Sequence, residues 1–199
     1  GMLAPGGASA ADAAHWVALS LIKEGQPAQA LALAEKILPQ AGQPAAAAQL
    51  SMDAADALYE IPARRNESID RYAATAAKYP KEPVAPQARY MAGFAALEQG
   101  KYDAAQKHSQ AFLAAYPDHE LAPSALRVAA ESNLQLGNYA EADKLYAQLI
   151  QQYPTHGDVE LWKVRRIVSL QLQKKHQETG AAMESLSGEL RTPDARAEA

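Results

Sequence analysis

The sequence APQARYMAGFAALEQGKYDAAQKHSQAFLAAYP at residues 85–117 is followed at residues 122–154 by APSALRVAAESNLQLGNYAEADKLYAQLIQQYP. At a spacing of 37 residues, both contain an Ala-Pro start, a central Gly-x-Tyr-x-x-Ala and a Tyr-Pro end. Proline is tolerated in the first turn of a helix, and glycine readily adopts the left-handed conformation that ends one. The final proline cannot continue a helix. Each stretch therefore predicts two helices joined at a glycine, Gly100 or Gly137.

The same spacing extends in both directions along the chain. A small residue is expected where the two helices of each pair cross, and this position is occupied by Ala30, Ser68, Ala105, Ala142 and Thr179. The pattern weakens in two pairs, because Ala63 and Lys174 stand where the turn glycine is expected. Asp56 occupies a position suited to a small apolar residue, which leaves the register of the second pair open. We predict five helix pairs within a repeat domain at 9–190, namely 9–38, 44–79, 84–116, 121–153 and 158–190.

The composition agrees with an all-α fold. Alanine, the best helix former, accounts for 46 of the 199 residues, whereas aromatic residues make up only 7%. The net charge of −4 argues against a nucleic-acid partner, because phosphate binding normally needs a basic excess. The chain has no cysteine, and we find no apolar stretch long enough to form an integral membrane segment.

The two ends of the chain fall outside this pattern. We expect residues 1–8 to be a flexible leader or the remnant of a tag. At the other end, Thr192-Pro193 aligns with Ala85-Pro86 in the repeat. Residues 191–199 are therefore predicted to be either a polar tail or the start of a further, truncated repeat.

The sequence contains no recognisable catalytic motif. It lacks a glycine-rich phosphate loop and a Gly-x-Ser-x-Gly elbow, and its five histidines do not show the spacing of zinc ligands. The carboxylate pairs Asp53/Asp56 and Glu141/Asp143 are assigned to exposed helix faces, because charged residues are rarely buried without a partner. We therefore predict no enzyme activity, no cofactor, no catalytic residue and no metal site.

The Gly-x-Tyr-x-x-Ala motifs at 100–105 and 137–142, preceded by Gly93 or Ala130, resemble the tetratricopeptide repeat (TPR) family. The Tyr-Pro ending and the 37-residue period resemble its long-period type, found in bacterial envelope proteins such as the Tol-Pal-associated cell-division coordinator and the outer-membrane assembly lipoprotein. The resemblance implies a right-handed α-α superhelix whose first helices line a concave groove. It also implies protein or peptide partners.

On this basis the groove-facing positions form the candidate partner-binding site. They are Tyr90, Phe94, Leu97, Arg127, Glu131, Leu134, Val164 and Val168, with His15 and Leu19 at the other end. The cationic clamp with which some TPR proteins hold a carboxylate is missing at these positions. A mixed apolar groove favours a partner helix or an extended peptide with aliphatic anchors. The alternative is that Tyr90 and Phe94 only pack between successive helix pairs.

A basic stretch at 163–176 stands out in the last pair. It contains Lys163, Arg165, Arg166, Lys174, Lys175 and His176, and it coincides with an alanine-free region at 148–180. It is either a patch for an acidic partner or an ordinary solvated face, and we favour the second interpretation because isolated surface charges are common. Trp162 and Leu161 are expected to fill the core there.

These features favour a non-catalytic protein–protein interaction scaffold in a bacterial multiprotein or envelope assembly. The alternative is a docking or regulatory region of a larger enzyme. Self-association through the ends of the array is a further expectation. The compartment is left open, and the envelope resemblance favours the periplasm over the cytoplasm.

Overall fold

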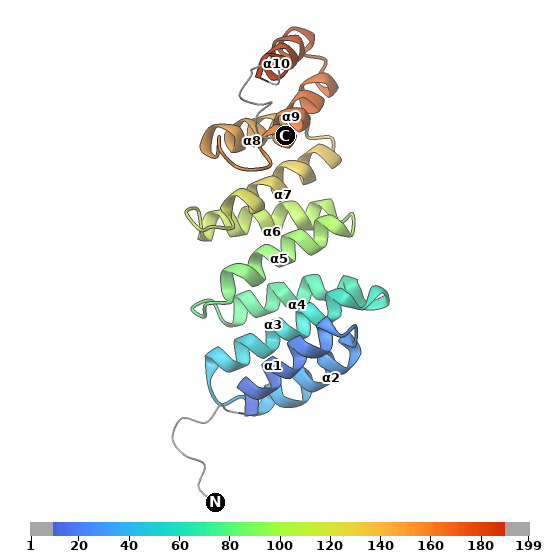
Figure 1. Cartoon of the computed structure of the whole chain (residues 1–199), viewed down its shortest axis with the longest axis vertical. Helices are drawn as coiled ribbons and strands as arrows, with labels where there is room; N and C mark the ends of the chain where they lie inside the picture. The colour runs from blue at the N-terminus through green and yellow to red at the C-terminus, as the bar shows by residue number, and fades with distance from the viewer. Residues whose placement is uncertain (1–9, 190–199) are drawn as a thin grey trace, which may run out of the picture. The chain divides into compact units, whose positions relative to one another are not determined.

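The computed structural model of the chain describes residues 10–189 (Figure 1). The predicted leader at 1–8 and the predicted tail at 191–199 lie outside these residues. Between residues 10 and 189 the chain is helical and contains no strand. It divides into two compact units, which we call unit 1 (up to Pro117) and unit 2 (from Asp118). Each unit is described by itself.

Unit 1 contains three helix pairs. Their helices are α1 (Ala10–Lys23), α2 (Pro27–Ile37), α3 (Pro44–Glu60), α4 (Arg65–Lys78), α5 (Ala85–Glu98) and α6 (Tyr102–Ala115). Short 3-10 helices follow α2 at Leu38–Gln40 and α3 at Pro62–Arg64. Each helix packs against the next one in the chain, and α1 packs against α3 as well as α2 (Figure 1). The core is largely alanine, and its larger side chains include Leu50, Tyr72 and Phe112.

Unit 2 contains two helix pairs. They are α7 (Ala122–Gln135) with α8 (Tyr139–Gln152), and α9 (Val159–Leu172) with α10 (His176–Glu189). Here too each helix packs against its successor. The core of unit 2 is less dependent on alanine and includes Leu126, Tyr146, Leu149 and Trp162.

The 37-residue period is visible in the helix starts. The second helices of four successive pairs begin at Arg65, Tyr102, Tyr139 and His176, each 37 residues after the one before. The all-α fold of about five helix pairs is therefore confirmed. The second pair keeps the common register, so Asp56 does occupy the position that holds Gly93 and Ala130 in the next two pairs.

The turns inside the pairs explain the recurring glycines. Gly25, Gly100 and Gly137 have φ values of 73°, 68° and 80°, in the left-handed region that favours glycine. After Gly100, the amide of Lys101 donates to the carbonyl of Ala96 at 2.9 Å, which closes the helix end in a Schellman motif. Lys174 adopts the same conformation with φ 61°, although it is not glycine. At Ala63 the chain forms a 3-10 turn instead.

Close helix crossing depends on the small residues. All five residues at the small position are buried: Ala30, Ser68, Ala105, Ala142 and Thr179. At Gly93, an added Cβ would lie 3.0 Å from Oγ of Ser109, so α5 and α6 cross too closely for a larger residue. These contacts fix which face of each first helix is buried and which is left for other interactions.

Candidate functional site

We define the first-helix face as the positions of Tyr90, Phe94 and Leu97 together with their equivalents in the other pairs. In unit 1 these three residues of α5 are half-buried. The ring of Tyr90 stacks on Phe94 with centroids 6.0 Å apart and meets the buried Phe112 edge-on at 6.4 Å. Phe94 also lies 6.5 Å from the ring of Tyr59 on α3. The aromatic side chains on α5 therefore pack against one another and offer only part of their surface to a partner.

On α3, the position equivalent to Tyr90 is occupied by Asp53, whose exposed fraction is 0%. Nδ1 of His15, from α1, lies 3.0 Å and 2.9 Å from the two carboxylate oxygens of Asp53. Gln49, one turn earlier on α3, donates to the same carboxylate at 3.4 Å. His15 was expected to face the groove. It does lie on the first-helix face, but its ring contacts the carboxylate of Asp53 in the same chain.

One turn after Asp53, the side chain of Asp56 is also taken out of solvent. Tyr72, from α4, donates its hydroxyl to Oδ1 of Asp56 at 2.7 Å. Burial is the main cause that raises the pKa of Asp56 to about 6; the hydrogen bond from Tyr72 opposes it, and the neighbouring Asp53 contributes to the rise. Burial is also the main cause that raises the pKa of Asp53, opposed by His15. The prediction that Asp53 and Asp56 lie on an exposed face is wrong, because α1 and α4 cover them and supply hydrogen-bonding partners.

Unit 2 places different residues on the first-helix face. On α7, Arg127 and Glu131 are half-buried. Tyr146 of α8 donates to Oε2 of Glu131 at 2.6 Å, and Nε of Arg165 on α9 lies 3.7 Å from the same oxygen. Leu134, the third predicted residue on α7, is only 8% exposed and belongs to the core. It therefore presents almost no surface to a partner.

The exposed side of α9 carries a stripe of aliphatic residues beside charged ones. Leu161, Val164 and Leu172 are 49%, 45% and 46% exposed, and Val168 between them is half-buried. Their spacing of three, four and four residues places them on one side of the helix. Trp162 fills the core as expected, but Leu161 does not, because it lies about 100° further round the helix, on the exposed side of α9. The spacing of Leu161 and Leu172 with the two valines was the sequence signal that could have identified this stripe.

Most cationic side chains of the basic stretch at 163–176 are paired with carboxylates. Arg166 donates through Nε to Asp143 at 2.8 Å, and Lys163 lies 3.0 Å from Glu160. Lys175 lies 3.5 Å from Glu178 and 3.9 Å from Asp143. Asp143 is therefore partly covered, in contrast to its predicted exposed position. These pairs are consistent with a solvated face and leave little uncompensated charge.

Residues 10–189 contain no group of three or more histidine or acidic side chains placed to hold a metal ion. In the same part of the chain, no helix combines the length and the apolar character needed to span a bilayer.

Comparisons with known proteins agree with this arrangement. The tetratricopeptide repeat family model matches residues 87–119 and 125–156. The match covers the third pair and the greater part of the fourth, and it does not single out the envelope type of repeat. In sequence, none of the curated proteins compared matches the chain.

Several solved structures share the fold at low sequence identity. A MamA structure from Desulfovibrio magneticus RS-1 aligns with a TM-score of 0.70 and 13% identity, over 92% of this chain and 97% of that one. The kinesin light chain TPR-like repeats of Podosopora anserina align with a TM-score of 0.68 and 15% identity, over 91% and 95%. MamA of AMB-1 aligns with a TM-score of 0.64 and 16% identity, over 87% and 95%. The chain therefore has a TPR-like fold of stacked helix pairs.

Proposed function

We propose that the chain is a non-catalytic interaction scaffold and that the exposed aliphatic stripe on α9 is a partner-binding surface. The single observation that carries this proposal is the exposure of Leu161, Val164 and Leu172, close to half of each side chain, on a helix whose other side is already buried. A helix in a solvated array normally shows polar residues on its exposed side. An aliphatic stripe in that place is typical of a protein contact.

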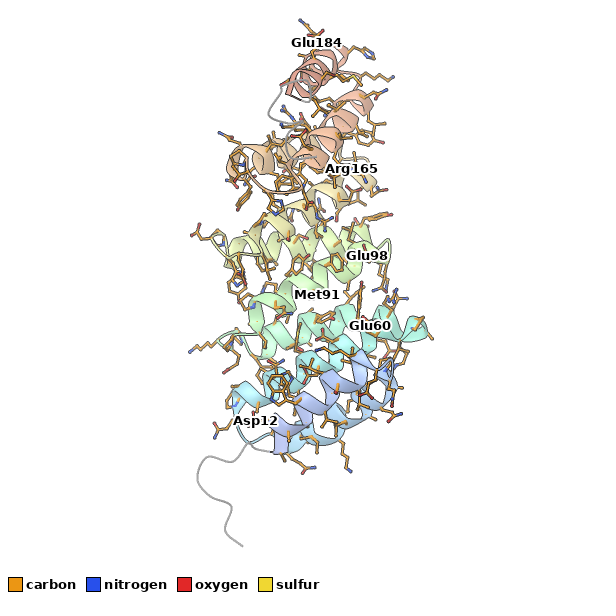
Figure 2. All side chains as sticks on the ribbon, in the orientation of Figure 1. Asp12, Glu60, Met91, Glu98, Arg165 and Glu184 are labelled. Atoms are coloured by element: carbon orange, nitrogen blue, oxygen red, sulfur yellow. The ribbon has the colours of Figure 1, made fainter. Side chains whose placement is uncertain are left out.

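The partner we infer is an amphipathic helix with aliphatic anchors and acidic residues beside them. The stripe runs the length of α9, so it matches the apolar face of another helix better than a single side chain. Arg165 borders the stripe and is labelled in Figure 2; its side chain is 44% exposed. Arg127, on α7, is close enough to act with Arg165 on the pKa of Tyr146. Arg127, Arg165 and Glu131 together carry one net positive charge, which acidic residues beside the partner's anchors would complement.

The aromatic residues of α5 are a weaker part of the same proposal. Tyr90, Phe94 and Leu97 keep some exposed surface, yet the two rings already stack on each other and on their neighbours. We include them as a secondary contact and leave out the buried Leu134. The resemblance to envelope proteins extends the proposal to a bacterial envelope assembly.

Affinity capture by the full chain from native extract tests the α9 surface. Synthetic peptides then test the chemistry of the inferred partner. The test variant is Val164→Asp/Val168→Asp, and the matched control is Gln148→Asp, which adds an acid at an exposed site on α8. We expect the control to retain the captured protein and the test variant to lose it, with both variants keeping the circular dichroism of the parent. Equal capture by the parent, the control and the test variant contradicts the α9 surface.

Synthetic helices then test the inferred partner chemistry. A peptide with leucines spaced to match the stripe and glutamates beside them should bind, and its lysine-flanked counterpart should bind at least tenfold more weakly. Equal affinity for the two peptides contradicts the acidic flank while leaving the aliphatic contact in place. Binding of neither peptide contradicts the proposal of a partner helix.

A further inference from the structure

A partly open cavity lies between the last three helices of unit 2. It has a volume of about 240 Å³ and is lined from α8, α9 and α10. The lining combines aliphatic side chains with two cations, and includes Ile150, Ile167, Ala182 and Leu186 together with Lys163 and Arg166. We propose that this cavity binds a small aliphatic carboxylate, with its hydrocarbon chain against the aliphatic residues and its charged end at the two cations.

The cavity exists because α10 carries smaller side chains on its packed side than α8 does. Ala182 occupies the position of Leu145 on α8, 37 residues earlier. Tyr146, next to Leu145, is buried in the core, whereas its equivalent on α10, Met183, is 51% exposed. Protein interiors are normally close-packed, and atoms that line a void lose the contacts that a filled space would give them. A ligand in the cavity supplies those contacts.

The size and the aliphatic lining suit a short hydrocarbon chain. Ile167 is buried, and Ile150, Ala182 and Leu186 are half-buried. An apolar cavity of about 150 Å³ is large enough to hold benzene, so the present volume fits an aliphatic chain of about eight carbons. Pockets for larger organic ligands start at about 300 Å³. The cavity is therefore too small for such a ligand or for a partner helix.

The two cations favour a negatively charged end on the ligand. The side chain of Lys163 is 22% exposed, and its ammonium lies 3.0 Å from Glu160, a carboxylate that is 49% exposed. Solvent screens that pair, so a ligand carboxylate replaces Glu160 at little cost. Arg166 donates through Nε to Asp143, and a guanidinium carries five N–H donors in all. The described residues that line the cavity include no carboxylate that would repel an anion.

The cavity is separate from the aliphatic stripe proposed as a partner-binding surface. Lys163 and Ile167 each precede a valine of the stripe by one residue, which places them about 100° further round α9. The residues of α8 and α10 that line the cavity take no part in the stripe. The two proposals therefore stand or fall independently.

Titration of the full chain with three probes at pH 7, followed by the NMR shifts of backbone amides, tests the proposal. Octanoate should bind saturably with a Kd below about 1 mM and should shift amides of α8, α9 and α10. Octylammonium, which has the same chain and the opposite charge, should bind about tenfold more weakly or less, with octan-1-ol between the two. Equal affinity for octanoate and octylammonium overturns the carboxylate site. Shifts that do not saturate, or that spread evenly over both units, overturn the cavity as the binding site.

A cavity-filling variant and its matched control sharpen the test. Ala182→Leu restores the larger side chain found at Leu145, so it should weaken octanoate binding about tenfold or more. It should also raise the melting temperature by about 2 to 4 °C, because it fills a void. Ala181→Leu adds the same group at the exposed neighbouring position on α10 and should bind octanoate as the parent does. Octanoate binding that is unchanged in Ala182→Leu, or weakened equally in both variants, contradicts the proposal.

A second pair of variants tests the recognition of charge. Lys163→Gln should reduce the preference for octanoate over octylammonium, whereas Arg165→Gln, which removes the same charge from an exposed site on the same helix, should preserve it. An equal loss of preference in both variants shows that only the general charge of unit 2 attracts the anion and overturns the assigned site. Because the probe titration uses the unmodified chain, a variant that fails to fold does not prevent the test.

Discussion

Units 1 and 2 share one repeat but use the first-helix face in different ways. In unit 1, Asp53 is buried under α1 and Phe94 is stacked among aromatic rings, so the face mainly holds the unit together. In unit 2, the equivalents of Tyr90 and Phe94 on α9 are Val164, which is exposed, and Val168, which is half-buried. The repeat fixes where a side chain stands, and the local sequence decides whether that position stabilises the chain or is left for a partner.

The largest expected difference between the units is at Phe94 and Val168, which are equivalent positions 74 residues apart. Phe94→Ala should lower the free energy of unfolding by about 2 to 3 kcal/mol, less than for a fully buried phenylalanine because the ring is only half-buried. Val168→Ala should cost less than about 1 kcal/mol. Chemical denaturation followed by circular dichroism measures both. If the two variants lose equal amounts of unfolding free energy, the first-helix face does not contribute more to stability in unit 1 than in unit 2.

The next difference concerns two tyrosine hydroxyls that each donate to a carboxylate. Tyr72→Phe removes the hydroxyl that donates to the partly buried carboxyl of Asp56 and should cost about 1 to 3 kcal/mol at pH 7. Tyr146→Phe leaves Glu131 with Arg165 close by, so its expected cost is about 1 kcal/mol. Thermal melts at pH 7 compare the two variants. A larger drop in melting temperature for Tyr146→Phe than for Tyr72→Phe contradicts the view that unit 1 holds the more deeply buried polar cluster.

These contrasts show how much of the molecule the sequence alone could predict. The helix pairs were predictable because Gly100 and Gly137, the prolines and the small residues impose backbone and packing constraints that repeat every 37 residues. The five small positions were predicted in this way, and all are buried. Local constraints of this kind are visible in a single sequence because each residue carries its own conformational preference.

The candidate sites were less predictable, because they depend on contacts between helices. His15 and Asp53 pair although they lie 38 positions apart in the sequence, and no sequence motif predicts this contact. The rule that carboxylates are exposed failed at Asp53 and Asp56, since α1 and α4 supply donors that make burial possible. Asp56 at a small apolar position was the available sequence signal. On α9, Val164 is exposed and Val168 is half-buried, whereas Leu161, which was expected to fill the core, is 49% exposed.

The turns within the helix pairs offer a prediction of intermediate size. Lys174 holds the left-handed conformation that Gly100 and Gly137 hold in the preceding pairs. Lys174→Gly should therefore stabilise unit 2 by up to about 1 kcal/mol, because the side chain no longer opposes that conformation. Gly100→Ala in unit 1 should cost about 1 kcal/mol for the same reason. A higher melting temperature for the first variant and a lower one for the second support the equivalence of the two turns.

The smallest expected effect concerns the ion pairs of unit 2. Arg166 and Asp143 form the shortest pair between two different helices of that unit, yet the arginine side chain is 39% exposed, so solvent screens the pair. Arg166→Gln should change the free energy of unfolding by less than about 1 kcal/mol. The effect should shrink when the salt concentration is raised, because mobile ions screen exposed charges. Denaturation at low and high salt measures it. A large, salt-insensitive loss would mean that the basic stretch is structural to unit 2 in the way that the buried His15 and Asp53 pair is structural to unit 1.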